Sequence, residues 1–140
     1  MVGFVVVGHG SVAEALIATA EGIVGPLEKT VPVNLLPHEG IDLGRSKIVQ
    51  AIHAVNDGDG VVLLADMFGG TPSNCCLSVL EEGKLEVVTG INLPMLLKIP
   101  ATRSQQLSVR ETARELVQNG QKNILFASDL LRARCQAAQG

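Results

Sequence analysis

Apolar and polar positions alternate along this chain in two different patterns, which predict its secondary structure. Short runs of Val, Leu and Ile that end at glycine or polar residues are typical of buried strands. Stretches with apolar residues three and four positions apart are typical of helices. Strands are predicted at about Val2–Gly8, Thr30–Leu36, Val61–Ala65, Leu85–Thr89 and Asn123–Ala127. Helices are predicted from Ser11 to Gly22–Gly25, over Ile41–Val55, from Pro72 to about Glu82, briefly from about Pro94, and over Arg110–Asn119.

The order of these elements predicts the fold class. Strands that alternate with helices form right-handed βαβ units and a mostly parallel sheet. We therefore expect an α/β protein with three layers, in which helices cover both faces of a doubly wound sheet of strand order 2-1-3-4. Residues 1–128 are expected to form one domain, and residues 129–140 a frayed polar tail. Ser11 and Glu14 have the spacing of a capping box at the start of the first helix.

Composition narrows the range of partners. Of the 140 residues, 46% are hydrophobic and 18% charged, which is typical of a well-buried globular chain. Only 2% are aromatic, with no Trp or Tyr, so surfaces that stack bases or sugars are disfavoured. The formal charge of −3 provides no basic field, so no nucleic-acid partner is expected. Glycine and charged residues interrupt every apolar run before it reaches a membrane-spanning length.

The cysteines are Cys75, Cys76 and Cys135. Their spacing is neither a CxxC motif nor an even framework, so structural zinc and disulfides are not expected. Free thiols fit a reducing compartment, and no basic segment precedes the first apolar run as it would in a signal peptide. We therefore predict a cytoplasmic protein, in which Cys75 and Cys76 pack as small apolar residues of a helix.

The strongest candidate for chemistry is His9. It lies between Gly8 and Gly10, directly after the first apolar strand. Ligands and reacting groups gather at the carboxyl ends of the strands in open α/β sheets. Glycine on both sides leaves the imidazole ring accessible to a large partner. His9 is therefore predicted to act as a nucleophile, whereas His38 and His53 are expected on the solvated surface.

Asp66 ends the third strand in the same way that His9 ends the first. Neighbouring strands lie about 4.8 Å apart, so we expect the carboxylate to accept a hydrogen bond from the imidazole. That bond would fix the tautomer and leave the other ring nitrogen with its lone pair. The glycines that follow allow a close backbone approach, and free amides at a helix start bind anions. The predicted phosphate-binding backbone is Gly10, Gly69, Gly70 and Thr71.

Other kinds of chemistry find less support in these motifs. No Lys or Arg lies in the loops around His9, which disfavours a nucleoside triphosphate site. Neither GxGxxG nor a P-loop is present, and no metal cluster accompanies the pair, so no metal or cofactor is expected. A phosphatase-type hydrolase with a His–Asp pair stays open as an alternative, as does a flavin or nucleotide module. A serine hydrolase would require a GxSxG motif, which the sequence lacks.

Three segments together resemble a known family. They are Val6–Gly10 with Ala13 and Glu14, then Leu64–Asn74, then Thr89–Met95, and they occur in the family's order. Over about Met1–Ala127 the chain is similar to a mannose-type enzyme IIA domain of the bacterial phosphoenolpyruvate-dependent sugar phosphotransferase system. The phosphoryl-donor domain of dihydroxyacetone kinase systems shares the early histidine, but the GGTPSN segment fits the mannose type better.

The resemblance implies a phosphocarrier. His9 would take a phosphoryl group, through Nε2, from the phosphohistidine of HPr and pass it to an enzyme IIB partner. Asp66 would orient the ring, and Gly69, Gly70 and Thr71 would contact the phosphate. The family forms homodimers that exchange a C-terminal strand, here Asn123–Ala127. No IIB domain follows in this sequence, so IIB is expected on a separate chain or to be absent. Contact with a membrane would be indirect, through a permease, and a stand-alone regulatory phosphoacceptor is the alternative role.

Overall fold

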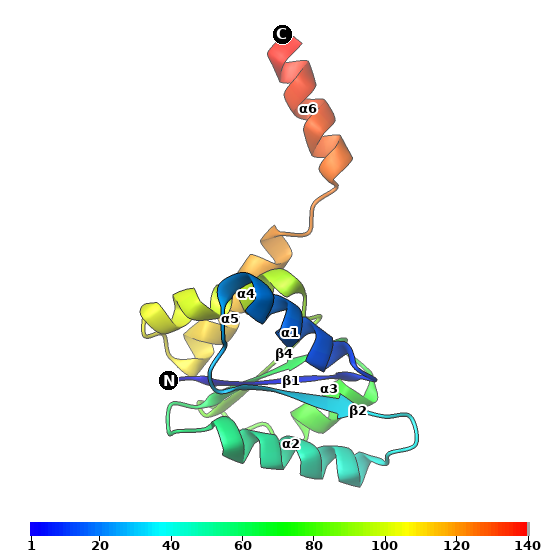
Figure 1. Cartoon of the computed structure of the whole chain (residues 1–140), viewed down its shortest axis with the longest axis vertical. Coiled ribbons are helices and arrows are strands. Elements are labelled where there is room, and N and C mark those ends of the chain that lie inside the picture. Colours follow the sequence, from blue (N-terminus) through cyan, green and yellow to red (C-terminus); the bar gives the residue numbers. More distant parts are fainter. Residues whose placement is uncertain (140) are drawn as a thin grey trace.

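A parallel sheet of four strands forms the centre of the protein, as Figure 1 shows in a computed structural model that describes residues 1–139. Its strand order is β2-β1-β3-β4, and every neighbouring pair is parallel. The expected α/β class and the strand order 2-1-3-4 are therefore confirmed. The strands are β1 (Gly3–His9), β2 (Thr30–Leu35), β3 (Val61–Ala65) and β4 (Leu85–Thr89).

Helices cover both faces of the sheet and give the three expected layers (Figure 1). Alternate side chains of β1 point to opposite faces, so Phe4 and Val6 join one core, and Val5 and Val7 the other. The first core lies beneath α1 (Val12–Val24), α4 (Leu93–Ser104) and α5 (Val109–Lys122). The second lies against α2 (Ile41–Val55) and α3 (Thr71–Leu77).

The buried strands are apolar on both faces because each face has its own helical layer. All five residues of β3 are fully buried, and so are Val5, Val6 and Val7 of β1. Such burial pins the two central strands, whose register pairs Val7 with Ala65. The carboxyl ends of β1 and β3 therefore meet at one edge of the sheet, which is called the carboxyl edge below.

Two predicted helix details were wrong. The capping box at Ser11 is absent: its backbone lies outside the extended region that a capping side chain needs, and Glu14 instead accepts a bond of 3.1 Å from the Asn34 amide. The third helix stops at Leu77, well before Glu82. Beyond it, the amides of Val79 and Leu80 donate to carbonyls three residues earlier, and not four as in an α-helix. A capping box does exist at the start of α5, between Ser108 and Glu111.

The C-terminal predictions also need correction. Residues 124–126 form no strand in the single chain, because the segment has no neighbouring strand to pair with, and Ala127 already begins α6 (Ala127–Gln139). The tail that we expected to be frayed is thus mostly helical. Figure 1 shows α6 extending away from the body of the molecule. Within residues 1–139, no helix is both long and apolar enough to cross a membrane.

Candidate functional site

His9 and Asp66 lie side by side at the carboxyl edge because their strands are neighbours. His9 is the last residue of β1, and Asp66 follows the last residue of β3. The backbone pairing continues one step beyond β3, where the Asp66 amide donates to the Val7 carbonyl at 3.1 Å. Pairing between β1 and β3 thus fixes the backbone of both residues, independently of the contact between their side chains.

The predicted contact between the imidazole and the carboxylate is present. Nδ1 of His9 lies 2.7 Å from Oδ2 of Asp66, and the same oxygen accepts the His9 backbone amide at 2.9 Å. An ionised carboxylate can only accept hydrogen bonds, so Nδ1 carries the proton and Nε2 keeps its lone pair. The His9 side chain is 52% exposed, whereas that of Asp66 is 16% exposed. The His9 ring is thus held by Asp66 and is half-exposed to solvent.

Asp66 is kept ionised by its hydrogen bonds. Burial by itself would raise the pKa of this carboxyl. The bonds from the His9 amide and the His9 ring, together with a 2.8 Å bond from the Met67 amide to Oδ1, outweigh burial and hold the pKa below its ordinary value of 3.8. The negative charge therefore persists beside His9 at neutral pH.

The backbone comes close to this pair at two glycines. A Cβ at Gly70 would lie 3.0 Å from Cε1 and 3.4 Å from Nε2 of His9, so this backbone packs directly against the nucleophilic end of the ring. A Cβ at Gly8 would lie 3.5 Å from Oδ2 of Asp66 and 3.3 Å from the Ala13 amide. The Gly70 backbone thus approaches the His9 ring more closely than most side chains would permit, whereas a Cβ at Gly8 would be in ordinary contact with Asp66 and tight only against the Ala13 amide.

The four residues predicted to bind phosphate differ in how their backbones are used. The Gly10 amide donates to the Leu35 carbonyl at 3.0 Å, and the Gly69 amide donates to Oγ of Ser73 at 2.9 Å. Gly70 lies against the ring, and Thr71 begins α3. Two of the four amides are thus engaged within the protein, and the phosphate-binding role of all four stays a prediction.

Sequence reasoning missed Ser73, which shapes this loop. Its side chain is fully buried, and its Oγ accepts from the Gly69 amide and donates to the Gly70 carbonyl at 3.1 Å. From the sequence, Ser73 could be expected only to bond to nearby backbone groups, as serine side chains commonly do.

A small cavity lies next to His9. Its volume is about 190 Å³, and the loop after β2 and the start of α3 enclose it. Gly10, Leu36 and Thr71 are among its lining residues. The described residues contain no group of three His, Cys, Asp or Glu side chains that could hold a metal ion.

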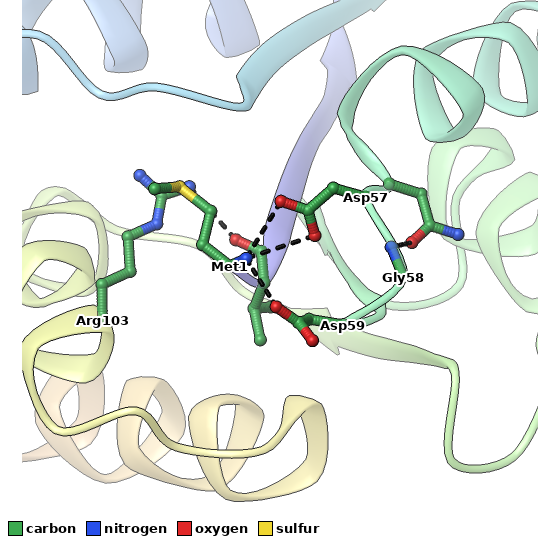
Figure 2. A network of polar contacts seen from close by, with 7 residues as sticks. Met1, Asp57, Gly58, Asp59 and Arg103 are labelled. Atoms are coloured by element: carbon green, nitrogen blue, oxygen red, sulfur yellow. Dashed lines mark hydrogen bonds and ion pairs between the residues drawn. The ribbon is translucent and has the colours of Figure 1, made fainter.

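A larger cavity, of about 650 Å³, lies at the opposite edge of the sheet, where β1 begins. Figure 2 shows the polar network beside it, in which Asp57 and Asp59 bind the Met1 ammonium group and Arg103 donates to the Val2 carbonyl at 3.1 Å. The Arg103 guanidinium also lies 5.2 Å from the Phe4 ring centroid. This network ties α4 and the β3 entry loop to the start of β1, at the end of the strand away from His9.

The comparisons with known proteins define the class. Residues 3–128 match the family described as "PTS system fructose IIA component", where PTS denotes the phosphotransferase system. The match covers most of the chain, so the protein belongs to this family of EIIA components, whose role is phosphotransfer in a sugar phosphotransferase system. The mannose-type resemblance drawn from the sequence is thereby confirmed.

Individual relatives agree with this assignment. The chain is 29% identical over 132 residues to the "PTS system fructose-specific EIIA component" of Bacillus subtilis (strain 168), covering 94% of this chain and 90% of that protein. It is 32% identical over 114 residues to the "PTS system sorbose-specific EIIA component" of Lacticaseibacillus casei, covering 81% of each. A crystal structure of the EIIA component from Streptococcus agalactiae superposes with a TM-score of 0.83 at 23% identity, covering 92% of this chain and 99% of that one, which shows the shared fold.

Proposed function

We propose that this protein carries a phosphoryl group on Nε2 of His9, receives it from the phosphohistidine of an HPr-like protein and passes it to an enzyme IIB protein. The observation that carries the proposal is the 2.7 Å bond between Nδ1 of His9 and the ionised Asp66. It leaves the lone pair of Nε2 on a ring that is 52% exposed, within reach of another protein.

The transfer step would proceed as follows. The Nε2 lone pair forms a bond to the phosphorus of the donor phosphohistidine, and the donor P–N bond breaks with its electron pair returning to the donor nitrogen. The donor leaves as neutral imidazole, because its other ring nitrogen already carries a proton. His9 keeps its Nδ1 proton, so the phosphorylated ring is cationic, and the carboxylate of Asp66 stabilises that charge at a distance of 2.7 Å. Passing the group to IIB repeats the same exchange in the opposite direction.

The chain supplies few groups of its own to hold the phosphoryl group, which fits a carrier. Gly70 packs against the His9 ring near Nε2, and Thr71 lines the small cavity next to His9. No Lys or Arg occurs at positions 9–12, 36–40, 66–71 or 90–93, at the ends and starts of the elements that meet here. A group held this lightly is available for onward transfer, whereas a phosphatase would need cations at the phosphate.

The three cysteines are free thiols, two of them buried, and the pKa of Cys76 is raised to about 12 by burial. Free thiols suit the reducing cytoplasm, which we propose as the site of action. The donor and the IIB acceptor would then be separate cytoplasmic proteins. Any contact with a membrane would pass through a permease that IIB serves.

The proposal also includes a homodimer. Among the described residues, β4 is the last strand of the sheet, and apart from an isolated bridge between Leu85 and Glu81 its outer edge is open. Ile124, Leu125 and Phe126 are 73%, 62% and 71% exposed. An open strand edge and an exposed apolar segment are both liabilities in a single chain. Pairing of this segment with β4 of a second copy would remove both.

The experiment uses enzyme I, HPr and phosphoenolpyruvate labelled with ³²P. We expect one acid-labile phosphate per chain in the wild type and none in His9→Ala. His38→Ala and His53→Ala are matched controls, since both histidines are exposed and lie outside the site, and both variants should be labelled like the wild type. Label that persists in His9→Ala, or that disappears in His38→Ala alone, would move the phosphorylation site and refute the assignment.

A further inference from the structure

We propose that the cavity of about 650 Å³ at the opposite edge of the sheet binds a small organic anion, whose charged group pairs with Arg103. It is called the amino-edge cavity below, because three strands begin beside it. Val2 precedes β1, Asp59 precedes β3, Gly83 precedes β4, and the loop between α4 and α5 encloses the other side. The cavity is separate from His9, so this inference goes beyond the proposed function and does not depend on it.

The size and the lining of the amino-edge cavity suit a molecule of metabolite size. Pockets that bind small ligands usually measure about 300 to 1,000 Å³ and combine apolar walls with a few polar groups. Here Val2, Leu107 and Val109 provide apolar walls, and Arg103 and Gln106 provide polar groups. The lining therefore has both parts that a ligand site requires.

Arg103 is a charged group with few partners of its own. Figure 2 shows it extending from α4 toward the start of β1, where Nη2 donates to the Val2 carbonyl at 3.1 Å. A guanidinium has several more N–H donors and stays charged at neutral pH. Within residues 1–139, Arg103 takes part in no ion pair, and its buried Nε has no hydrogen-bond partner. An anion with acceptor oxygens would compensate this cation.

The pKa of Arg103 agrees with this description. Burial lowers the pKa of the guanidinium, although the charges of Glu28 and Asp57 act to raise it. Neither acid forms an ion pair with Arg103 among the described residues. The cation is thus removed from water without a direct counter-charge.

The acidic side chains that line the cavity are already engaged. Asp59 binds the Met1 ammonium group, and Oε2 of Glu111 accepts the Ser108 amide at 2.9 Å. Glu111 also lies in the first turn of α5, where the positive end of the helix dipole compensates its charge. Arg103 has no comparable partner, so the ligand that the cavity favours is an anion.

Gln106 provides a second and independent observation. It follows α4, lines the cavity and has a φ of 54°, in the left-handed region that favours glycine. Its backbone amide donates to the Arg103 carbonyl at 3.1 Å, in the kind of helix ending where glycine is most common. The chain thus keeps an amide side chain at this cavity at a conformational cost that glycine would avoid. Strained backbone of this kind gathers at ligand sites.

The lining also indicates how the ligand would be held. Phe4 is fully buried, and the Arg103 guanidinium lies 5.2 Å from the centroid of its ring, so no aromatic face is open for stacking here. Charge and hydrogen bonds must therefore provide the recognition. The side-chain amide of Gln106 offers a donor and an acceptor to the uncharged part of the ligand. A phosphorylated or carboxylated molecule with hydroxyl groups fits this set.

The experiment measures binding by isothermal titration calorimetry with three probes that share a hexose skeleton. Glucose 6-phosphate carries a phosphate, gluconate carries a carboxylate, and glucose is uncharged. We expect the wild type to bind at least one of the two anions at a single site per chain, with a Kd in the millimolar range or tighter, and not to bind glucose. Comparison of the two anions distinguishes a phosphate from a carboxylate ligand.

Arg103→Met tests the charged contact, and Arg110→Met is its matched control. Each variant loses one positive charge close to the loop between α4 and α5, but Arg110 is exposed and lies outside the cavity lining. Arg103→Met should weaken anion binding at least tenfold, the size typical of a hydrogen bond to a charged group. Arg110→Met should bind like the wild type.

Gln106→Gly separates binding from folding. Glycine adopts the left-handed φ without strain, so the midpoint of unfolding in urea should stay the same or rise. Anion binding should weaken about fivefold, the size of one neutral hydrogen bond. Damage to the fold cannot explain a variant that is at least as stable as the wild type and binds less tightly.

Several outcomes would overturn the proposal. Failure of both anions to bind the wild type at millimolar concentrations would refute the site. Equal losses in Arg103→Met and Arg110→Met would show a general effect of charge and no defined site. If Arg103→Met does not fold, unchanged binding by Gln106→Gly would place the anion outside this cavity. The labelling of His9 tests the proposed function separately, so the two proposals can fail independently.

Discussion

At the scale of single residues, the site depends on how one carboxylate is used. Oδ2 of Asp66 accepts both the ring and the backbone N–H of His9, and Oδ1 accepts the Met67 amide. Each of these bonds favours the ionised acid, which is why the pKa of Asp66 is lowered in spite of its burial. The bond at Nδ1 also favours the imidazole tautomer in which Nε2 has a lone pair, as the proposed function requires.

Asp66→Asn tests both consequences. A carboxyl whose pKa is lowered in the folded protein stabilises the fold above its unfolded value of 3.8, and this contribution is lost as pH falls through the lower folded value. The free energy of unfolding in urea should therefore fall less between pH 6 and pH 3 in Asp66→Asn than in the wild type. The variant should also accept phosphate from the small donor phosphoramidate more slowly at pH 7.

The acidic groups outside the site serve as an internal control for that measurement. Glu39, Asp57 and Glu111 also have a lowered pKa, and all three remain in Asp66→Asn. Only the difference between the two pH dependences reports on Asp66. Identical dependences would show that the folded protein does not hold this carboxyl in its charged form.

At the scale of elements, the loop before α3 positions the backbone against His9. Ser73 lies in the first turn of α3, and its single hydroxyl joins the Gly69 amide to the Gly70 carbonyl. Gly69 has a φ of 88°, in the left-handed region that favours glycine. One buried hydroxyl therefore maintains the turn that places Gly70 next to Nε2.

Ser73→Ala should loosen this turn. We expect a loss of about 1 kcal/mol in the free energy of unfolding, because the exposed Gly69 amide can bind water in place of Oγ. Phosphorylation of His9 by phosphoramidate should slow, since Gly70 is no longer fixed. Ser78→Ala is the control, because Ser78 lies directly after α3, is exposed, and its hydroxyl donates to the Cys75 carbonyl, a bond outside the turn before α3. Wild-type phosphorylation by Ser73→Ala would show that the loop holds its place without this hydroxyl.

At the scale of the whole molecule, the two ends of the sheet differ in which residues they expose and in how they are held together. The carboxyl edge exposes His9, Met67 and Phe68, whereas the opposite edge is held by the network around Met1 and Arg103 (Figure 2). The C-terminal segment belongs to neither end. Ile124, Leu125 and Phe126 are exposed between α5 and α6, and Figure 1 shows α6 away from the body.

The proposed dimer should depend on Leu125. Leu125 and Leu131 are both 62% exposed, but only Leu125 lies in the segment predicted to pair with β4 of a second copy. Light scattering after size-exclusion chromatography should give a dimer for the full chain and for Leu131→Asp. Leu125→Asp should shift the protein toward the monomer, because a charge would be buried in the pairing. A monomeric wild type, or equal effects of the two substitutions, would contradict the strand exchange.

Much of the fold could be predicted from the sequence because its strands carry a strong local signal. β1 and β3 are apolar at nearly every position, so their existence, their burial and the strand order followed from pattern and topology. The C-terminal strand could not be tested in the same way, since Ile124–Phe126 finds no partner strand within its own chain. The Ser11 capping box failed because the Ser11 backbone, with a φ of −105° and a ψ of 13°, lies outside the extended region of a capping residue.

The sequence by itself determined which residues could react: a histidine between glycines and an aspartate, each at the end of an apolar strand. It could do so because strand ends are readable from local composition. Only the tertiary structure decided how these groups are used. Contacts between distant segments place Oδ2 of Asp66 2.7 Å from Nδ1 and engage the Gly10 amide. They also leave Phe68 in solvent two residues after Asp66. Such contacts depend on how the layers pack, and no local pattern encodes them.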